Sequence, residues 1–161
     1  LPNAGKSTLL NNLTAATSRV GVYPFTTTEP HLGVLFEFVL ADIPGLIAGA
    51  SSGKGLGHKF LRHISRTKML LQLVSAAETD PESDYYTILN ELKNYDSSLL
   101  EKERWVIVTK KDLVNKEEID SLVAKLEKNE NRVFVISEFD DDSVKFLRDE
   151  LVAHLRTTYN S

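Results

Sequence analysis

The sequence predicts an α/β fold in which helices cover both faces of a mostly parallel sheet. Three apolar runs of strand length, at about 69–74, 105–109 and 133–137, alternate with longer segments of helical periodicity. Polar motifs follow the expected strands at their carboxyl ends, which is where α/β sheets bind their ligands. One domain over residues 1–161 accounts for the whole pattern.

The first part of the chain is expected to contain two helices, two loops and one strand. Three leucines with helical spacing predict a helix over about 6–16. A loop rich in threonine, proline and glycine follows over 18–33, and the apolar segment 35–40 predicts a strand. A glycine-rich loop over 45–57 then leads to a predicted helix over 58–66.

The middle of the chain is expected to form a strand, a helix and a second strand. After the strand over 69–74, Asp84 is predicted to cap a helix that runs to about residue 95. The apolar face of that helix is expected to consist of Tyr85, Ile88, Leu89 and Leu92. The apolar segment 105–109 then predicts a buried strand.

The last part of the chain is expected to form helix, strand and helix. Asn115 and Glu118 have the spacing of a capping box and predict a helix to about residue 128. After the strand over 133–137, Asp141 or Asp142 is expected to start the final helix. The inner face of the final helix is predicted to be Val144, Leu147, Leu151 and Leu155.

Composition excludes several classes of protein. With 42% apolar and 26% charged residues, the chain is expected to be globular rather than disordered. The net charge is −4 and no lysine–arginine cluster stands out, so we expect no DNA binding by this domain. No apolar run approaches the roughly 20 residues of a membrane-spanning helix. The chain has no cysteine, which excludes a disulfide scaffold and favours a cytoplasmic location.

Residues 1–8 (LPNAGKST) resemble the second half of a phosphate-binding loop, G-x-x-x-x-G-K-[ST]. Backbone N–H groups at a helix N-terminus attract phosphates, a lysine such as Lys6 pairs with them, and the Ser7 hydroxyl can ligate Mg²⁺. The candidate nucleotide-binding residues in this loop are Asn3, Ala4, Gly5, Lys6, Ser7 and Thr8. The opening glycine and the strand before it are expected upstream of Leu1, so we interpret the chain as an N-terminally truncated domain.

Asp42 and Gly45 fit a D-x-x-G motif at the end of a strand. In P-loop proteins this carboxylate holds Mg²⁺ through water, and the glycine N–H contacts the γ-phosphate. An ordinary turn begun by aspartate would give the same pattern. The position of the motif, about 35 residues after Ser7, favours a nucleotide site.

Residues 109–112 (TKKD) occupy the place of a guanine motif that usually reads N-K-x-D. The Asp112 carboxylate can accept hydrogen bonds from N1–H and the 2-amino group of guanine, a pair of donors that adenine lacks. The Lys110 stem can lie over the base, whereas Thr109 replaces the usual asparagine and can make only part of its bonds. Ser137 ends the last strand, where GTPases usually carry Ser-Ala-x, and is the one residue of that motif retained.

The threonine run 26–28 lies in the loop after the first helix. A threonine hydroxyl in that loop can complete the Mg²⁺ shell when a γ-phosphate is present, which makes the loop a switch. A polar surface loop without such a role is the alternative.

With these motifs, the chain resembles the Obg family of ribosome-associated GTPases over nearly its whole length. The most specific matches are residues 1–8, YPFTT at 23–27, ADIPGLI at 41–47 and the segment 55–64 (GLGHKFLRHI). Two features depart from the family. The hairpin between Gly33 and Asp42 is short, and the usual alanine after Ser137 is missing. The glycine-rich N-terminal domain of the family is also not part of this sequence.

The resemblance implies a P-loop NTPase fold and a molecular switch that binds GTP and GDP and hydrolyses GTP slowly. It implies a role in assembly of the large ribosomal subunit or in stress and growth control, with that subunit or its assembly intermediates as the partner. The catalytic residues would be Lys6, Thr27 and Gly45. The Mg²⁺ ligands would be Ser7, Thr27 and Asp42, and Phe25 and Thr26 would also contact the nucleotide.

Two residues bear on the rate of hydrolysis. Leu46 stands where Ras-type enzymes carry the glutamine that positions the attacking water, so we expect an intrinsic rate of roughly 10⁻⁴ to 10⁻³ per second. Asn3 suggests a bound K⁺ that acts like an arginine finger, although a role in shaping the turn is the simpler alternative. Two other functions stay open: a nucleotide-gated binding module with negligible catalysis, and an ATP-dependent P-loop enzyme, against which Asp112 argues.

Overall fold

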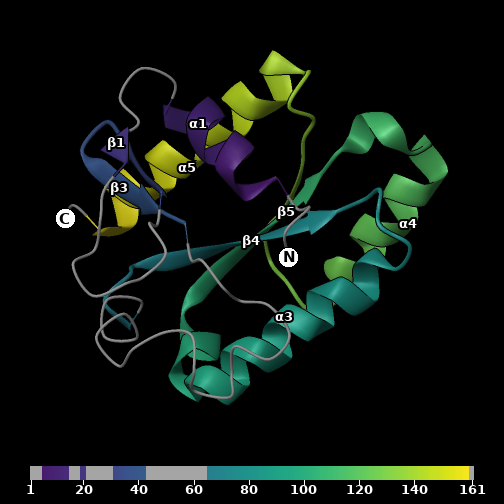
Figure 1. The fold of residues 1–161 in the computed structure, drawn as a ribbon, viewed down its shortest axis with the longest axis horizontal. Helices are drawn as coiled ribbons and strands as arrows, with labels where there is room; N and C mark the ends of the chain where they lie inside the picture. The colour runs from purple at the N-terminus through teal and green to yellow at the C-terminus, as the bar shows by residue number, and fades with distance from the viewer. Residues whose placement is uncertain (1–4, 15–18, 21–30, 43–64, 160–161) are drawn as a thin grey trace.

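The computed structural model describes residues 5–14, 19–20, 31–42 and 65–159, which contain two three-stranded sheets (Figure 1). The first sheet is antiparallel and has the order β1 (Arg19–Val20), β2 (His31–Leu35) and β3 (Phe38–Ala41). The second sheet is parallel and has the order β4 (Met69–Ser75), β5 (Glu103–Thr109) and β6 (Val133–Val135). The predicted α/β class is therefore confirmed.

A tight hairpin joins β2 to β3, where the sequence predicted one strand over 35–40. Leu35 pairs with Phe38, so Phe36 and Glu37 form a two-residue turn. Phe36 has a φ of 53°, a left-handed conformation that a phenylalanine rarely adopts. The strand predicted from the apolar segment 35–40 is wrong, because no glycine or asparagine marks the turn. The short hairpin between Gly33 and Asp42 that the family resemblance implied is confirmed.

The predicted loop over 18–33 is wrong at both of its ends. Arg19 pairs with Leu32 and Val20 with His31, so β1 and the start of β2 lie inside that segment. A strand of two residues is too short to show the alternation of apolar and polar residues that predicts a strand. β1 forms because it pairs with β2, which lies eleven or more residues further along the chain.

Helix α1 (Lys6–Thr14) begins where the sequence predicted, and β2 packs directly against it. A Cβ atom at Gly33 would lie 2.5 Å from Cγ2 of Thr14, which is closer than nonbonded carbon atoms approach. Glycine at position 33 is therefore the residue that lets the strand come this close to the helix.

Helix α3 (Pro81–Tyr95) begins earlier than predicted. Asp80 caps it, with Oδ1 accepting a 3.0 Å hydrogen bond from the Ser83 N–H, and Pro81 occupies the first turn. Asp84 lies inside that first turn, so the prediction that it caps the helix is wrong. The predicted apolar face is right, since Tyr85, Ile88 and Leu92 are buried and Leu89 packs against the core.

The two last helices agree with the sequence. Helix α4 (Lys116–Leu126) has the predicted capping box, in which Asn115 and Glu118 exchange hydrogen bonds between side chain and backbone. Helix α5 (Asp141–Tyr159) starts at Asp141 and buries Val144, Leu147, Leu151 and Leu155, as predicted. Two short 3-10 helices, η2 (Ser97–Glu101) and η3 (Lys111–Leu113), were not predicted.

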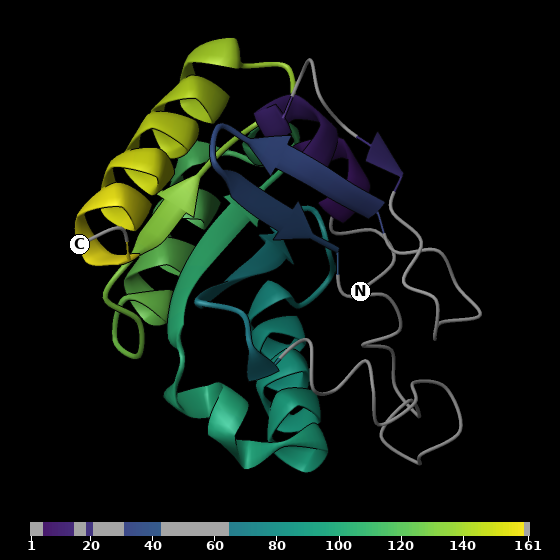
Figure 2. The same cartoon turned by 90° about the vertical axis from the view of Figure 1, so that its left-hand side faces the viewer.

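Strand β5 separates two apolar cores. Its side chains alternate: Trp105 and Ile107 pack with α1 and α5, while Val106 and Val108 pack with α3 and α4. All four have no exposed surface. Figures 1 and 2 show the two helix pairs on opposite sides of the parallel sheet, which confirms the prediction of helices on both faces.

A buried polar cluster ties α3 to β5 and to the turn after α4. Oε1 of Glu130 accepts a 2.5 Å hydrogen bond from the Tyr85 hydroxyl and a 3.1 Å bond from Nε of Arg104, whose Nη2 also pairs with it. Tyr85 is 1% exposed and Glu130 is 8% exposed. Burial and the bond to Glu130 raise the pKa of Tyr85, so the hydroxyl stays protonated as a donor.

A second polar cluster lies where β5 begins and α5 ends. Oε2 of Glu103 accepts a 2.7 Å hydrogen bond from the Tyr159 hydroxyl, and Oε1 lies 2.7 Å from Nε2 of His154. Burial raises the pKa of Glu103, but the bonds from His154 and Tyr159 lower it by more, and the net pKa is lowered. Burial and the bond to Glu103 raise the pKa of Tyr159 to about 12.

Within the described ranges, none of the helices combines the length and the apolar character needed to cross a bilayer. The predicted loop over 45–57 and all but the end of the predicted helix over 58–66 lie outside these ranges.

Candidate nucleotide-binding site

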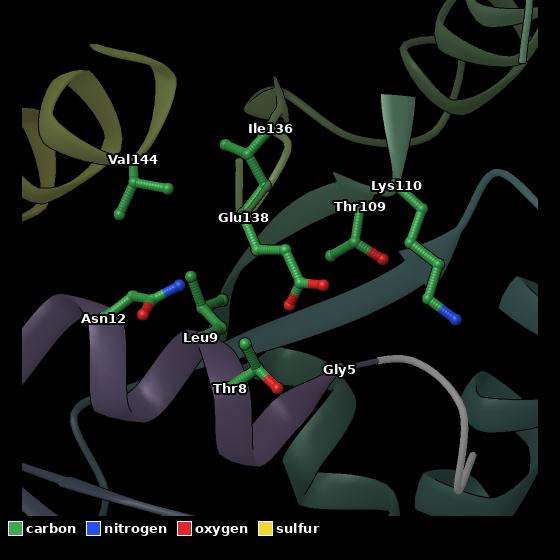
Figure 3. A pocket seen from close by; sticks show the side chains of 9 residues that line it. All are labelled: Gly5, Thr8, Leu9, Asn12, Thr109, Lys110, Ile136, Glu138 and Val144. Atoms are coloured by element: carbon green, nitrogen blue, oxygen red, sulfur yellow. The ribbon is translucent and has the colours of Figure 1, made fainter. Parts of the chain in front are cut away.

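A pocket lies between the first turns of α1, the carboxyl end of β5 and the loop after β6 (Figure 3). Three segments that are far apart in the sequence therefore meet at one edge of the parallel sheet, as expected for a ligand site in an α/β fold. The pocket is lined by Gly5, Thr8, Leu9, Asn12, Thr109, Lys110, Ile136, Glu138 and Val144.

One end of the pocket is the start of α1. Gly5 has a φ of 83°, and its carbonyl accepts the first helical hydrogen bond from the Leu9 N–H at 2.9 Å. Lys6 follows at the first helical position, with its neighbours Ser7 and Thr8 exposed. Backbone N–H groups at a helix start, together with the helix dipole and a lysine, give this end an affinity for anions such as phosphate.

A salt bridge joins this end to the strand that leads into the D-x-x-G motif. Nζ of Lys6 lies 3.0 Å from Oδ1 of Asp42, whose side chain is 11% exposed. The contact places a carboxylate beside the predicted phosphate loop although the two residues come from different elements. Lys6 and Asp42, two residues predicted for the phosphate and Mg²⁺ end of the site, are therefore brought together.

The donor atoms at this end fit a hard divalent cation. Mg²⁺ prefers oxygen ligands and usually takes one or two protein carboxylates or hydroxyls, completing its shell with water and phosphate oxygens. The Ser7 hydroxyl and the Asp42 carboxylate are donors of this kind, and Ser7 adjoins the lysine that contacts Asp42. These two residues would hold Mg²⁺ on this side of the pocket.

The other end of the pocket is formed by the chain after β5. Thr109 closes the strand with 6% of its surface exposed, and its carbonyl accepts a 3.0 Å hydrogen bond from the Ala76 N–H. Lys110 has a φ of 60° and a ψ of 36°, a left-handed conformation that turns the chain sharply into η3. Such strained backbone at a non-glycine residue is often found at functional sites.

Asp112 lies in η3 and is held from the neighbouring loop. The Ser137 hydroxyl donates a 2.6 Å hydrogen bond to Oδ1 of Asp112, and the Phe139 N–H donates to that hydroxyl oxygen at 3.2 Å. Ser137 is 2% exposed, so its hydroxyl has a fixed environment. Lys111 reinforces the arrangement through a salt bridge to Asp140.

The predicted site residues that the structure describes fall into two groups beside the pocket, and Gly5, Thr8, Thr109 and Lys110 line it. Lys6, Ser7 and Asp42 gather near the start of α1, and Thr109, Lys110, Asp112 and Ser137 gather after β5 and β6. Other predicted residues lie outside the described ranges: Asn3, Ala4, Phe25, Thr26, Thr27, Gly45 and Leu46.

Sequence reasoning missed part of the lining. Glu138 and Asn12 carry no motif, and their place in the pocket follows from tertiary packing. The one signal for Glu138 was its position, because it occupies the place after Ser137 where an alanine is usual.

Residues 1–111 match the sequence profile of the family described as 50S ribosome-binding GTPase. The chain belongs to this GTPase family. It is 47% identical to GTPase Obg of Prochlorococcus marinus strain NATL1A over 96% of the chain, and 46% identical to GTPase Obg of Bacteroides fragilis strain YCH46 over 84% of the chain. The resemblance to Obg GTPases is confirmed.

The chain spans about half the length of the curated relatives it matches, with 48% of the Prochlorococcus protein and 36% of the Bacteroides protein covered. Among solved structures, it resembles the G domain of the T. maritima FeoB iron transporter with a TM-score of 0.66 and 22% identity, covering 94% of this chain and 92% of that one. It resembles a point variant of Aquifex aeolicus Era bound to GDP.AlF4- with a TM-score of 0.61 and 23% identity, over 91% and 53% of the two chains. At these identities the structural matches establish the fold alone.

Proposed function

We propose that residues 1–161 are the G domain of a molecular switch that binds GTP and GDP and hydrolyses GTP. The observation that carries this proposal is the position of Asp112. Its carboxylate is oriented by Ser137. Asp112 lies two residues after Lys110, and Thr109 and Lys110 line the pocket together with Gly5 and Thr8 from the start of α1. A purine nucleotide needs both ends at once, an anion site for its phosphates and a polar partner for its base.

The start of α1 would bind the phosphates. Backbone N–H groups at the helix start donate to phosphate oxygens, and the Lys6 ammonium exchanges part of its contact with Asp42 for the β- and γ-phosphates. Mg²⁺ bound by Ser7 and Asp42 would neutralise charge on those phosphates. Released from Lys6, the Asp42 carboxylate would become available to the hydrated ion.

The η3 end would select the base. The Asp112 carboxylate accepts from N1–H and the 2-amino group of guanine, whereas adenine would leave a carboxylate without donors. The aliphatic stem of Lys110 would cover one face of the base. Because Thr109 replaces an asparagine, we expect the same base preference with fewer supporting hydrogen bonds.

Hydrolysis would be slow, and the lifetime of bound GTP would then time the switch. Leu46 has no group that could orient water by hydrogen bonding, in contrast to the glutamine of Ras-type enzymes. Thr27 and Gly45 would respond to the γ-phosphate, and Asn3 would help to hold a K⁺ beside it. The alternative of a nucleotide-gated module with negligible turnover rests on the same Leu46.

The partner we propose is the large ribosomal subunit or one of its assembly intermediates, in large-subunit assembly or in stress and growth control. The family description and the Obg relatives support this proposal. A cytoplasmic location agrees with it.

A titration of the full-length protein with labelled GDP, GTP and ATP in Mg²⁺ tests the base selectivity. We expect tight binding of GDP and GTP and weak binding of ATP. Asp112→Asn should lose guanine nucleotides and gain xanthosine diphosphate, because an amide can donate to the 2-carbonyl oxygen that xanthine has in place of the amino group. Asp120→Asn, on the exposed face of α4, is the matched control and should bind as the unchanged protein does.

ATP binding as tight as GDP binding would overturn the assignment of Asp112 and favour an ATP-dependent P-loop enzyme. Unchanged GDP affinity in Asp112→Asn would do the same.

A further inference from the structure

Glu138 places an acidic side chain inside the pocket. Figure 3 shows its carboxylate extending from the loop after β6 into the space between Thr8 on α1 and Thr109 at the end of β5. This is the region between the anion-binding end and the base-binding end of the pocket. A negative charge here is unexpected, because the proposed ligand is itself a polyanion.

Within the described part of the chain, no cation balances this carboxylate. Across residues 5–14, 31–42 and 65–159, Glu138 forms no salt bridge. Two lysines next to residues of the pocket are paired with other carboxylates, Lys6 with Asp42 and Lys111 with Asp140. In Figure 3 the Lys110 ammonium points away from it. The negative charge is therefore uncompensated among the residues that the structure describes.

We propose that Glu138 sets the lifetime of the bound nucleotide by competing with it for the pocket. The proposal rests on the proposed function and names the residue of the same site that governs release. A nucleotide that enters must displace the side chain or strip water from it, and an unpaired carboxylate resists the loss of its water. The bound phosphates and the carboxylate also repel each other, and because Glu138 is exposed, salt weakens this repulsion.

Both effects favour rapid release of GDP. Glu138 is exposed, so its side chain can swing toward solvent when a nucleotide binds and return when the nucleotide leaves. With Glu138 in place, the pocket would exchange its nucleotide faster than the same pocket with a small neutral residue.

Two substitutions separate bulk from charge. Glu138→Gln keeps the size of the side chain and removes its charge, and Glu138→Ala removes both. The dissociation rate of labelled GDP, measured by stopped flow with the full-length protein, should fall roughly tenfold in Glu138→Ala, as expected when an unpaired charge is removed from a binding pocket. The GDP dissociation rate of Glu138→Gln should lie between the rate of Glu138→Ala and that of the unchanged protein.

Salt provides a second readout. The difference between the unchanged protein and Glu138→Gln should shrink as KCl is raised from about 0.05 M to about 1 M, since salt screens the charge. The difference between Glu138→Gln and Glu138→Ala should persist. Glu101→Ala makes the same change of net charge just before β5 begins, away from the pocket, and should leave the rate unchanged.

The outcomes distinguish the two proposals. Release from Glu138→Ala as fast as from the unchanged protein, with guanine binding still lost in Asp112→Asn, would overturn the role of Glu138 and leave the proposed function intact. A full-length protein that binds no guanine nucleotide, with or without Glu138, would overturn both.

Discussion

The Ser137 hydroxyl donates a 2.6 Å hydrogen bond to Oδ1 of Asp112, although the two residues lie in separate loops after β5 and β6. The carboxylate is thereby oriented before any ligand arrives. Orientation in advance lowers the entropic cost of binding, because the side chain loses little further freedom.

Removing this hydroxyl should weaken guanine binding in particular. A hydrogen bond to a charged group contributes about 1.5–3 kcal/mol, so Ser137→Ala should raise the Kd for GDP by about 10- to 100-fold. The weak affinity for ATP should not change, since adenine makes no use of Asp112. Isothermal titration calorimetry of the full-length protein measures both affinities.

Ser98→Ala is the control for that experiment, because the Ser98 hydroxyl donates a similar 2.7 Å bond to Asp96 outside the pocket. Equal losses of GDP affinity in the two variants would point to general destabilisation and contradict the positioning role of Ser137.

In the Tyr85–Glu130–Arg104 cluster, the loss of unfolding free energy should depend strongly on which residue is replaced. Glu130→Ala leaves the Arg104 guanidinium, whose side chain is 11% exposed, without its carboxylate and should destabilise the fold by about 3–5 kcal/mol. Tyr85→Phe keeps the ion pair and should cost about 1 kcal/mol. Urea unfolding curves measure both free energies.

The double variant Arg104→Met with Glu130→Gln tests the cause. It should recover a large part of the loss, because no charge is left buried without a partner and glutamine can still accept from Tyr85. A double variant as unstable as Glu130→Ala would show that lost packing, rather than the unpaired charge, dominates.

The Glu103 cluster predicts loss of stability in acid. The pKa of Glu103 is lower in the folded chain than its ordinary value of 4.5, so its contribution is complete above that value. The contribution disappears as the pH falls through the lowered pKa. Glu103→Gln should therefore lower the free energy of unfolding by about 1.5 kcal/mol at pH 7, and by progressively less from pH 4.5 downward.

Urea unfolding of both proteins at several pH values between about 7 and about 2.5 gives this difference directly. Glu101→Gln, at an exposed position two residues earlier, should show no comparable pH dependence. A cost for Glu103→Gln that stays constant down to about pH 2.5 would contradict the assignment.

Slow hydrolysis is the fourth expectation. Single-turnover assays with the full-length protein should give roughly 10⁻⁴ to 10⁻³ per second without a partner. If Asn3 helps to hold K⁺, the rate in KCl should exceed that in NaCl, and equal rates would rule out this role. A rate near one per second would contradict the part assigned to Leu46.

Local pattern was sufficient to predict most helices and buried strands. The capping box of Asn115 and Glu118 and the apolar face of α5 depend on contacts within a few residues, so they can be recognised from spacing alone. The prediction of Asp84 as the cap of α3 missed Asp80, although Pro81 directly after Asp80 is a typical start signal.

Long-range contacts account for what the sequence did not predict. The Phe36–Glu37 turn is fixed by the pairing of β2 with β3 rather than by turn residues. Glu130 meets partners 26 and 45 positions away. In the site, the motifs predicted which residues gather, whereas the Ser137–Asp112 bond depends on two loops brought together by the sheet.

The close approach of Gly33 to Thr14 has a consequence for related chains. Space for one added methyl group is missing between β2 and α1, so bulk at position 33 requires loss of bulk at position 14. The two positions should therefore covary: a relative with alanine at the place of Gly33 is expected to carry a smaller residue at the place of Thr14. Covariation of these two positions among relatives would therefore reveal the contact between β2 and α1 from sequences alone. Neither residue lines the nucleotide pocket.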